Sequence, residues 1–136
     1  MKLQAVLFDL DGTLVDSAAD LGAAVDQMRT CRGLPSLPFE SYRQAAGAGA
    51  RGLLQVAFGM TPDDADYAVY SREFLNNYEQ RLTVETRVFA GVAALLQKLE
   101  QCQLPWGIVT NKIARFAEPI TRQLPELQSA GVVISG

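Results

Sequence analysis

A short apolar run that ends in two acidic residues restricts the fold of this chain more than any other feature. Residues 5–8 are all apolar, and the run Asp9–Thr13 (Asp-Leu-Asp-Gly-Thr) follows at once. An uninterrupted apolar run of this kind is typical of a strand buried on both faces of a parallel sheet. Open α/β sheets bind ligands at the carboxyl ends of their strands. The sequence therefore predicts a buried strand that carries two carboxylates to a ligand-binding edge.

The last third of the chain repeats this pattern of strand and helix. Trp106–Val109 and Val132–Ile134 are further apolar runs, while residues 91–99 and 112–128 carry apolar side chains at helical spacing. Helices that alternate with apolar strands predict an α/β fold with a parallel sheet and right-handed crossovers.

The middle of the chain has a different character. Residues 16–32, 42–58 and 62–81 have helical patterns, interrupted by glycines near positions 47–49 and 59, and no convincing strand is visible. We therefore predict a helical insertion over residues 16–85, within an α/β core made of residues 1–15 and 86–136.

Composition excludes several classes of function. The 136 residues carry a net charge of −3, contain no histidine and have only two cysteines, Cys31 and Cys102. The negative net charge gives no sign of a basic surface that would bind nucleic acid or an anionic membrane. The absence of histidine excludes Ser-His-Asp and Cys-His catalysis. No stretch has the length of a membrane span or the pattern of a signal peptide, so we expect a cytoplasmic protein.

The acidic pair fits metal-assisted phosphate chemistry. Asp9 and Asp11 are two residues apart and can share one side of the strand end, while Gly12 permits a sharp turn and Thr13 adds a hydroxyl. Two adjacent carboxylates repel each other unless a cation is present, and hard oxygen ligands suit Mg²⁺. Asp9 can attack phosphorus as a nucleophile, and Asp11 can serve as general acid and base.

Two other interpretations of the acidic pair were weighed. In a calcium loop that starts at Asp9, the required glycine would fall on Leu14 and the bidentate glutamate on Asp20, so that pattern fails. A solvated turn that caps the next helix stays possible, but it leaves two carboxylates at the end of an apolar strand unexplained.

Two segments resemble motifs of the haloacid dehalogenase-like hydrolases. Val6–Leu14 resembles the first motif of that family, and Ile108–Lys112 resembles the second. Within that family the chain is similar to enzymes of the phosphoglycolate phosphatase type, and residues 110–120 look especially like the N-acetylmuramic acid 6-phosphate phosphatases. The resemblance implies a Rossmann-like core with a helical cap inserted after the first motif.

The resemblance also implies roles for individual residues. Asp9 would be nucleophile and Mg²⁺ ligand, and Asp11 would be general acid and base and would bind Mg²⁺ through its main-chain carbonyl. Thr110 and the Asn111 amide would hold phosphoryl oxygens, although Thr110 can equally cap a helix.

Four further residues are candidates for binding the substrate. Gly12 and Thr13 belong to the first-motif turn, and Lys112 is either a phosphate-facing charge or a surface lysine. Arg51 lies in the glycine-rich segment 47–52, where it would meet an anionic or sugar portion of the substrate or lie in solvent.

The family's third motif supplies a lysine and its fourth an acidic pair, and neither can be assigned within residues 1–136. We therefore expect the N-terminal portion of a longer phosphatase, poorly stable and weakly active alone, with the edge of the Asp9 strand exposed. The whole protein would be a monomer or homodimer.

The function predicted from the sequence is magnesium-dependent hydrolysis of a small phosphorylated metabolite through an aspartyl-phosphate. The substrates that we expect are phosphoglycolate or N-acetylmuramic acid 6-phosphate. A phosphosugar mutase and a non-catalytic binding fragment are the alternatives, and a dehalogenase is disfavoured because Asp11-Gly12-Thr13 matches the phosphatase version of the motif.

Overall fold

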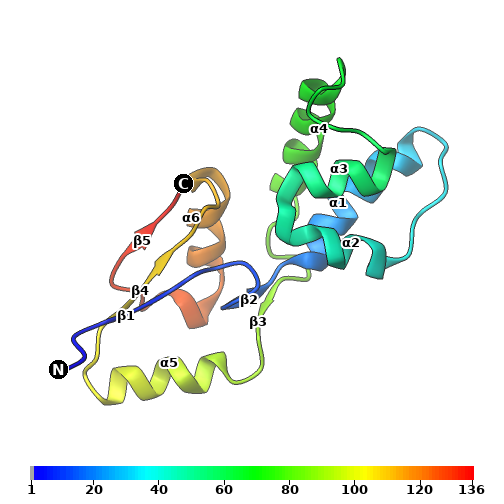
Figure 1. Cartoon of the computed structure of the whole chain (residues 1–136). Coiled ribbons are helices and arrows are strands. Elements are labelled where there is room, and N and C mark those ends of the chain that lie inside the picture. The colour runs from blue at the N-terminus through cyan, green and yellow to red at the C-terminus, as the bar shows by residue number, and fades with distance from the viewer. Residues whose placement is uncertain (1) are drawn as a thin grey trace. The chain divides into compact units, whose positions relative to one another are not determined.

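The computed structural model describes residues 2–136, which form two compact units (Figure 1). The first unit joins the chain up to Asp16 to Arg87–Gly136, and the second is Ser17–Thr86. We call them the sheet unit and the helical unit.

The sheet unit is built on three parallel strands in the order β1-β4-β5 (Figure 1). These are β1 (Val6–Phe8), β4 (Trp106–Val109) and β5 (Val133–Ile134). Because β1 pairs with β4 and β4 with β5, the carboxyl ends of β1 and β4 meet at one edge of the sheet. This arrangement confirms the predicted α/β class with a parallel sheet, and it brings the two motifs to that shared edge.

Close packing in the centre of this sheet depends on Gly107 in β4. A Cβ atom at this position would lie 2.6 Å from Cγ1 of Val132 and 2.9 Å from the Val132 carbonyl oxygen. Trp106, the preceding residue, is buried and meets Phe8 of β1 edge to face at a ring distance of 6.2 Å. The absence of a side chain at Gly107 thus lets the segment before β5 approach β4 closely.

Two helices complete the sheet unit. α5 (Val92–Gln101) buries Val92 and Leu96, which belong to the apolar stripe that the sequence predicted. α6 (Ala114–Gln123) is followed by a short 3₁₀ turn, η2 (Pro125–Leu127), and buries residues at helical spacing: Phe116, Ala117, Ile120 and Thr121.

A short antiparallel pair marks the points where the chain leaves and re-enters the sheet unit. β2 (Val15–Asp16) pairs with β3 (Arg87–Val88), with Val15 opposite Val88 and Asp16 opposite Arg87. Each strand has only two residues, which is too short to produce a periodic pattern in the sequence.

The helical unit contains α1 (Ala18–Cys31), α2 (Phe39–Ala45), the 3₁₀ turn η1 (Ala46–Ala48), α3 (Gly49–Phe58) and α4 (Tyr67–Glu79). The break predicted near residues 47–49 is present as η1, and Gly49 has a φ of +63°. α4 begins later than predicted because the Thr61 amide donates to the Asp64 carboxylate, which stabilises a turn. Across residues 2–136, none of the helices combines the length and apolar character that crossing a bilayer needs.

The first turn of α1 contains a fully buried carboxylate, Asp20. Its oxygens accept hydrogen bonds from Arg81 Nε at 3.1 Å, from the Glu85 amide at 3.0 Å, and from the Thr86 amide and hydroxyl at 2.8 and 2.7 Å. Asp20 therefore ties the start of the helical unit to its end.

A second carboxylate of α1, Asp26, holds the loop between α1 and α2. It accepts hydrogen bonds from the Ser36 hydroxyl, the Leu37 amide and the Tyr42 hydroxyl. Burial alone raises the pKa of the Asp26 carboxyl, but these hydrogen bonds and the nearby Arg29 together hold that pKa below its ordinary value. The folded state therefore favours the ionised carboxylate.

Asp26→Asn is expected to lower the free energy of unfolding at neutral pH by about 1 kcal/mol, because bonds to a charged acceptor are replaced by weaker ones. Since the folded pKa is depressed, the ionised carboxylate stabilises the fold above the unfolded pKa, and this contribution is lost as the pH falls through the folded pKa. Urea unfolding of both proteins between pH 7 and pH 3 measures the difference, which should shrink in acid. A difference that grows in acid would contradict this assignment.

Candidate active site

A tight turn, anchored on Leu10, follows the C-terminal end of β1. The Leu10 side chain is fully buried, and its amide donates to Asp9 Oδ1 at 2.7 Å. The Leu10 carbonyl accepts hydrogen bonds from three successive amides, those of Thr13, Leu14 and Val15, at 3.0 to 3.3 Å. Gly12 has a φ of +76°, which favours glycine at this point of the turn. Asp9 is thus exposed at the strand end, on a backbone that its neighbours fix.

The loop after β4 is fixed in a comparable way. The Thr110 amide donates to the Ile134 carbonyl at 2.9 Å, and the Thr110 hydroxyl accepts a hydrogen bond from the Lys112 amide at 3.1 Å. The Lys112 carbonyl in turn accepts from the Gly136 amide at 2.9 Å. The N-cap of α6 is Ile113, so the Thr110 hydroxyl stabilises the loop instead of capping that helix.

Gly136 packs against the main chain of the loop after β4, a contact that sequence patterns did not reveal. A Cβ atom on Gly136 would collide with the main-chain carbonyl oxygen of Asn111. The requirement for glycine comes from contact between two chain segments that are distant in sequence, so no local motif signals it.

An ion pair joins the two motifs. Lys112 Nζ lies 3.0 Å from Oδ1 and 2.9 Å from Oδ2 of Asp11, although the two residues are 101 positions apart. Only 9% of the Lys112 side chain is exposed, compared with 33% of that of Asp11. Lys112 is therefore not an ordinary surface lysine, and its ammonium group lies within the acidic site.

The remaining predicted residues lie in two places. Gly12 and Thr13 are exposed on the first turn, and Asn111 is exposed on the second, next to Thr110. Arg51 is exposed in the first turn of α3, in the helical unit. The sheet unit thus gathers all the predicted site residues except Arg51.

The oxygen atoms at this edge suit a hard divalent cation. Mg²⁺ is commonly held by one or two protein oxygens, while water and substrate phosphate complete its octahedral shell. The exposed Asp9 carboxylate meets this requirement, whereas both Asp11 carboxylate oxygens already contact an ammonium group. Within residues 2–136 no three acidic, cysteine or histidine side chains gather as a metal site. The donor set therefore fits a partly hydrated ion better than a closed protein cage.

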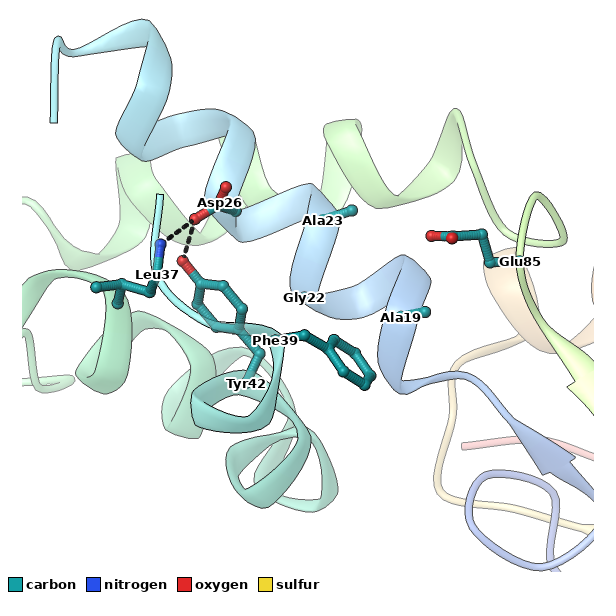
Figure 2. A pocket seen from close by; sticks show the side chains of 8 residues that line it. All are labelled: Ala19, Gly22, Ala23, Asp26, Leu37, Phe39, Tyr42 and Glu85. Carbon is teal, nitrogen blue, oxygen red and sulfur yellow. Dashed lines mark hydrogen bonds between the residues drawn. The ribbon is translucent and has the colours of Figure 1, made fainter. Parts of the chain in front are cut away.

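The helical unit contains a separate pocket of about 400 Å³. Figure 2 shows its small residues on α1 and its aromatic side chains on α2, with Asp26 directed at the Leu37 amide and the Tyr42 hydroxyl. The charged residues in its lining are Asp26 and Glu85, and the full lining is Ala19, Gly22, Ala23, Asp26, Leu37, Phe39, Tyr42 and Glu85. Two carboxylates without a basic residue in the lining make this pocket unfavourable for an anion.

Three features agree with the comparison to known proteins: the carboxylate of Asp9 at the end of β1, the loop with Thr110 after β4, and the helical insertion. The family model described as haloacid dehalogenase-like hydrolase matches residues 3–135. The chain belongs to the haloacid dehalogenase-like hydrolases. The sequence-based recognition of this family is thus confirmed, and the core of this family member is the Rossmann-like sheet unit.

The curated relatives that the chain resembles are named as phosphatases. The chain is 40% identical over 134 residues to the N-acetylmuramic acid 6-phosphate phosphatase of Pseudomonas aeruginosa, and 44% identical over 133 residues to the phosphoglycolate phosphatase of Xanthomonas campestris pv. campestris strain 8004. These matches include 98% of this chain but 59% and 60% of the relatives. The chain thus spans about three fifths of their length.

Solved structures show the same fold. A predicted phosphoglycolate phosphatase from Haemophilus somnus superimposes with a TM-score of 0.80 at 24% identity, covering 98% of this chain and 63% of its own. A predicted phosphatase from Clostridium acetobutylicum gives a TM-score of 0.77 at 22% identity, covering 99% and 62%.

Proposed function

We propose that this family member is a magnesium-dependent phosphatase that hydrolyses a small phosphorylated metabolite through an aspartyl-phosphate on Asp9. The observation that carries the proposal is the meeting of the two motifs at one sheet edge, where Lys112 contacts both carboxylate oxygens of Asp11. Membership of the family and the names of the curated relatives support it.

The first half of the reaction uses Asp9 as nucleophile. Its exposed carboxylate oxygen bonds to phosphorus, the bond from phosphorus to the substrate oxygen breaks, and Asp11 donates a proton to the departing alcohol. In the second half, a water oxygen bonds to phosphorus, the bond to Asp9 breaks, and Asp11 takes a proton from the water. Inorganic phosphate leaves, Asp9 is again an ionised carboxylate, and Asp11 again carries the proton that it donated in the first half.

The loop after β4 holds the phosphoryl group in this scheme. The Thr110 hydroxyl and the Asn111 amide donate hydrogen bonds to phosphoryl oxygens, and Lys112, with Gly12 and Thr13 on the facing turn, contributes to the same site. The hydrogen bond from the Thr110 amide to the Ile134 carbonyl of β5 keeps these donors in place before substrate arrives, so little reorganisation is needed.

Asp9, through its carboxylate, and Asp11, through its main-chain carbonyl, are the proposed ligands of Mg²⁺. When bound, the ion neutralises phosphate charge and helps to orient the phosphoryl group for in-line attack.

The proposed substrates are phosphoglycolate and N-acetylmuramic acid 6-phosphate, because these substrates give the relatives their names. Arg51 on α3 is the proposed contact for the part of the substrate beyond the phosphate, since an exposed guanidinium pairs well with carboxylates. Phosphate release from each compound, measured with protein in excess, ranks the two.

Removal of the metal is expected to reduce phosphate release to background, and added Mg²⁺ should restore it. Charge neutralisation by the ion is worth several kcal/mol in such reactions, so the loss should be about 100-fold or more. The measurement is phosphate release before and after EDTA treatment, with Ca²⁺ as the control ion because it is larger and coordinates less rigidly. Undiminished release in EDTA would exclude the magnesium scheme, and phosphate binding without release would favour a binding module.

A further inference from the structure

The contact between Lys112 and Asp11 restrains the carboxylate more strongly than an ordinary surface ion pair. The ammonium group lies within hydrogen-bonding distance of both carboxylate oxygens, at 3.0 and 2.9 Å, so it restrains the direction in which the carboxylate group points. Because the lysine side chain is only 9% exposed, solvent and salt screen this contact less than they screen a surface pair. The pair therefore limits the directions that Asp11 can face.

The lysine is itself held in place by the ends of two strands. Its amide donates to the Thr110 hydroxyl, and its carbonyl accepts from the Gly136 amide. Thr110 is in turn hydrogen-bonded to Ile134 of β5. The main chain at Lys112 is therefore tied to the segments that follow β4 and β5, and from there its side chain reaches Asp11.

We propose that Lys112 is a positioning residue, which holds the Asp11 carboxylate in the orientation needed to take a proton from the hydrolytic water. The proposal rests on the phosphatase function above. Proton transfer from water to Asp11 belongs to the second half of the reaction, and it requires the carboxylate to face the attacking water. Lys112 should therefore matter most for breakdown of the phosphoenzyme, in which water bonds to phosphorus and the bond to Asp9 breaks.

The test follows the phosphoenzyme directly. Wild type and Lys112→Met are mixed with p-nitrophenyl phosphate and Mg²⁺, and intact-protein mass spectrometry gives the phosphorylated fraction over time. This donor is used because nitrophenolate departs without a proton, so formation of the phosphoenzyme does not depend on an acid. Lys112→Met should slow breakdown of the phosphoenzyme by about 10-fold or more and raise the phosphorylated fraction. A loss of this size is a part of the rate enhancement that general base catalysis commonly gives.

Two further variants separate charge from structure. Lys112→Arg keeps a cation near Asp11 and should bring breakdown back to within a few-fold of wild type. Lys98→Met makes the same chemical change in the last turn of α5 and should leave breakdown unchanged. Failure of the arginine variant to restore breakdown, or an equal effect at Lys98, would overturn the proposal.

A role for Lys112 in phosphate binding alone predicts the opposite sign: Lys112→Met would slow formation, lower the phosphorylated fraction and leave breakdown unchanged. Equal slowing of both steps would show a general structural role, and either result overturns the inference.

The Asp11→Asn variant separates failure of the inference about Lys112 from failure of the proposed function, because it should trap the phosphoenzyme. A trap in Asp11→Asn with normal breakdown in Lys112→Met removes the inference alone, while no phosphoenzyme in either wild type or Asp11→Asn removes both.

Discussion

Asp9→Asn is expected to abolish both the phosphoenzyme and the release of phosphate. The amide has nearly the shape of the carboxylate but lacks the anionic oxygen that bonds to phosphorus. Loss of a covalent nucleophile commonly lowers the rate by a factor of about 10³ or more, so activity should fall to background. Intact-protein mass after incubation with p-nitrophenyl phosphate and Mg²⁺ reports the phosphoryl adduct, and a phosphate assay reports release.

A matched control separates loss of the nucleophile from loss of a negative charge. Glu118→Gln removes one carboxylate from an exposed position on α6, in the same unit, and should retain the adduct. Circular dichroism should show an intact fold in Asp9→Asn, since the side chain is exposed and its neighbour Leu10 supplies the buried anchor. An adduct that persists in Asp9→Asn would assign the covalent step to another residue.

Asp20→Ala is expected to have the largest effect on stability. The change removes an acceptor that is fully buried and leaves Arg81, the Glu85 amide and the Thr86 amide and hydroxyl without it. Breaking a buried charged network by removing one partner costs about 3–5 kcal/mol. Urea unfolding, followed by helical circular dichroism, should show a loss of this size.

Local measurements identify where the effect of Asp20→Ala begins. Hydrogen exchange at the Glu85 and Thr86 amides should accelerate more than exchange in the sheet unit, because both amides donate to Asp20. Asp63→Ala, in an exposed turn, is the matched control and should change stability by less than about 0.5 kcal/mol. Equal effects at Asp20 and Asp63 would show that the buried network contributes little.

The strands of the parallel sheet and the acidic turn could be predicted from sequence because their signals are local. An apolar run identifies β1, and the residues that follow it include both carboxylates and the glycine of the turn. Thr110 was found for the same reason, since it directly follows the apolar run of β4.

Features that depend on contacts between distant segments could not be predicted in this way. The pairing of Lys112 with Asp11 spans 101 positions, and a lysine after a strand is ordinarily an exposed residue. Asp20 belongs to an amphipathic helix, where an acidic residue in the first turn fits a solvent-facing position equally well. Gly136 is required by the Asn111 carbonyl, which only the folded sheet brings near.

The pairing of β2 with β3 joins the two ends of the insertion that forms the helical unit. Asp16, where the chain leaves the sheet unit, lies opposite Arg87, where the chain returns, so the excursion between them begins and ends at nearly the same place. A change in the length or sequence of residues 17–86 therefore need not alter the register of β1 against β4, which brings Asp9 and Thr110 to the same edge of the sheet. The helical unit can therefore differ in sequence without displacing Asp9 and Thr110 from the edge of the sheet.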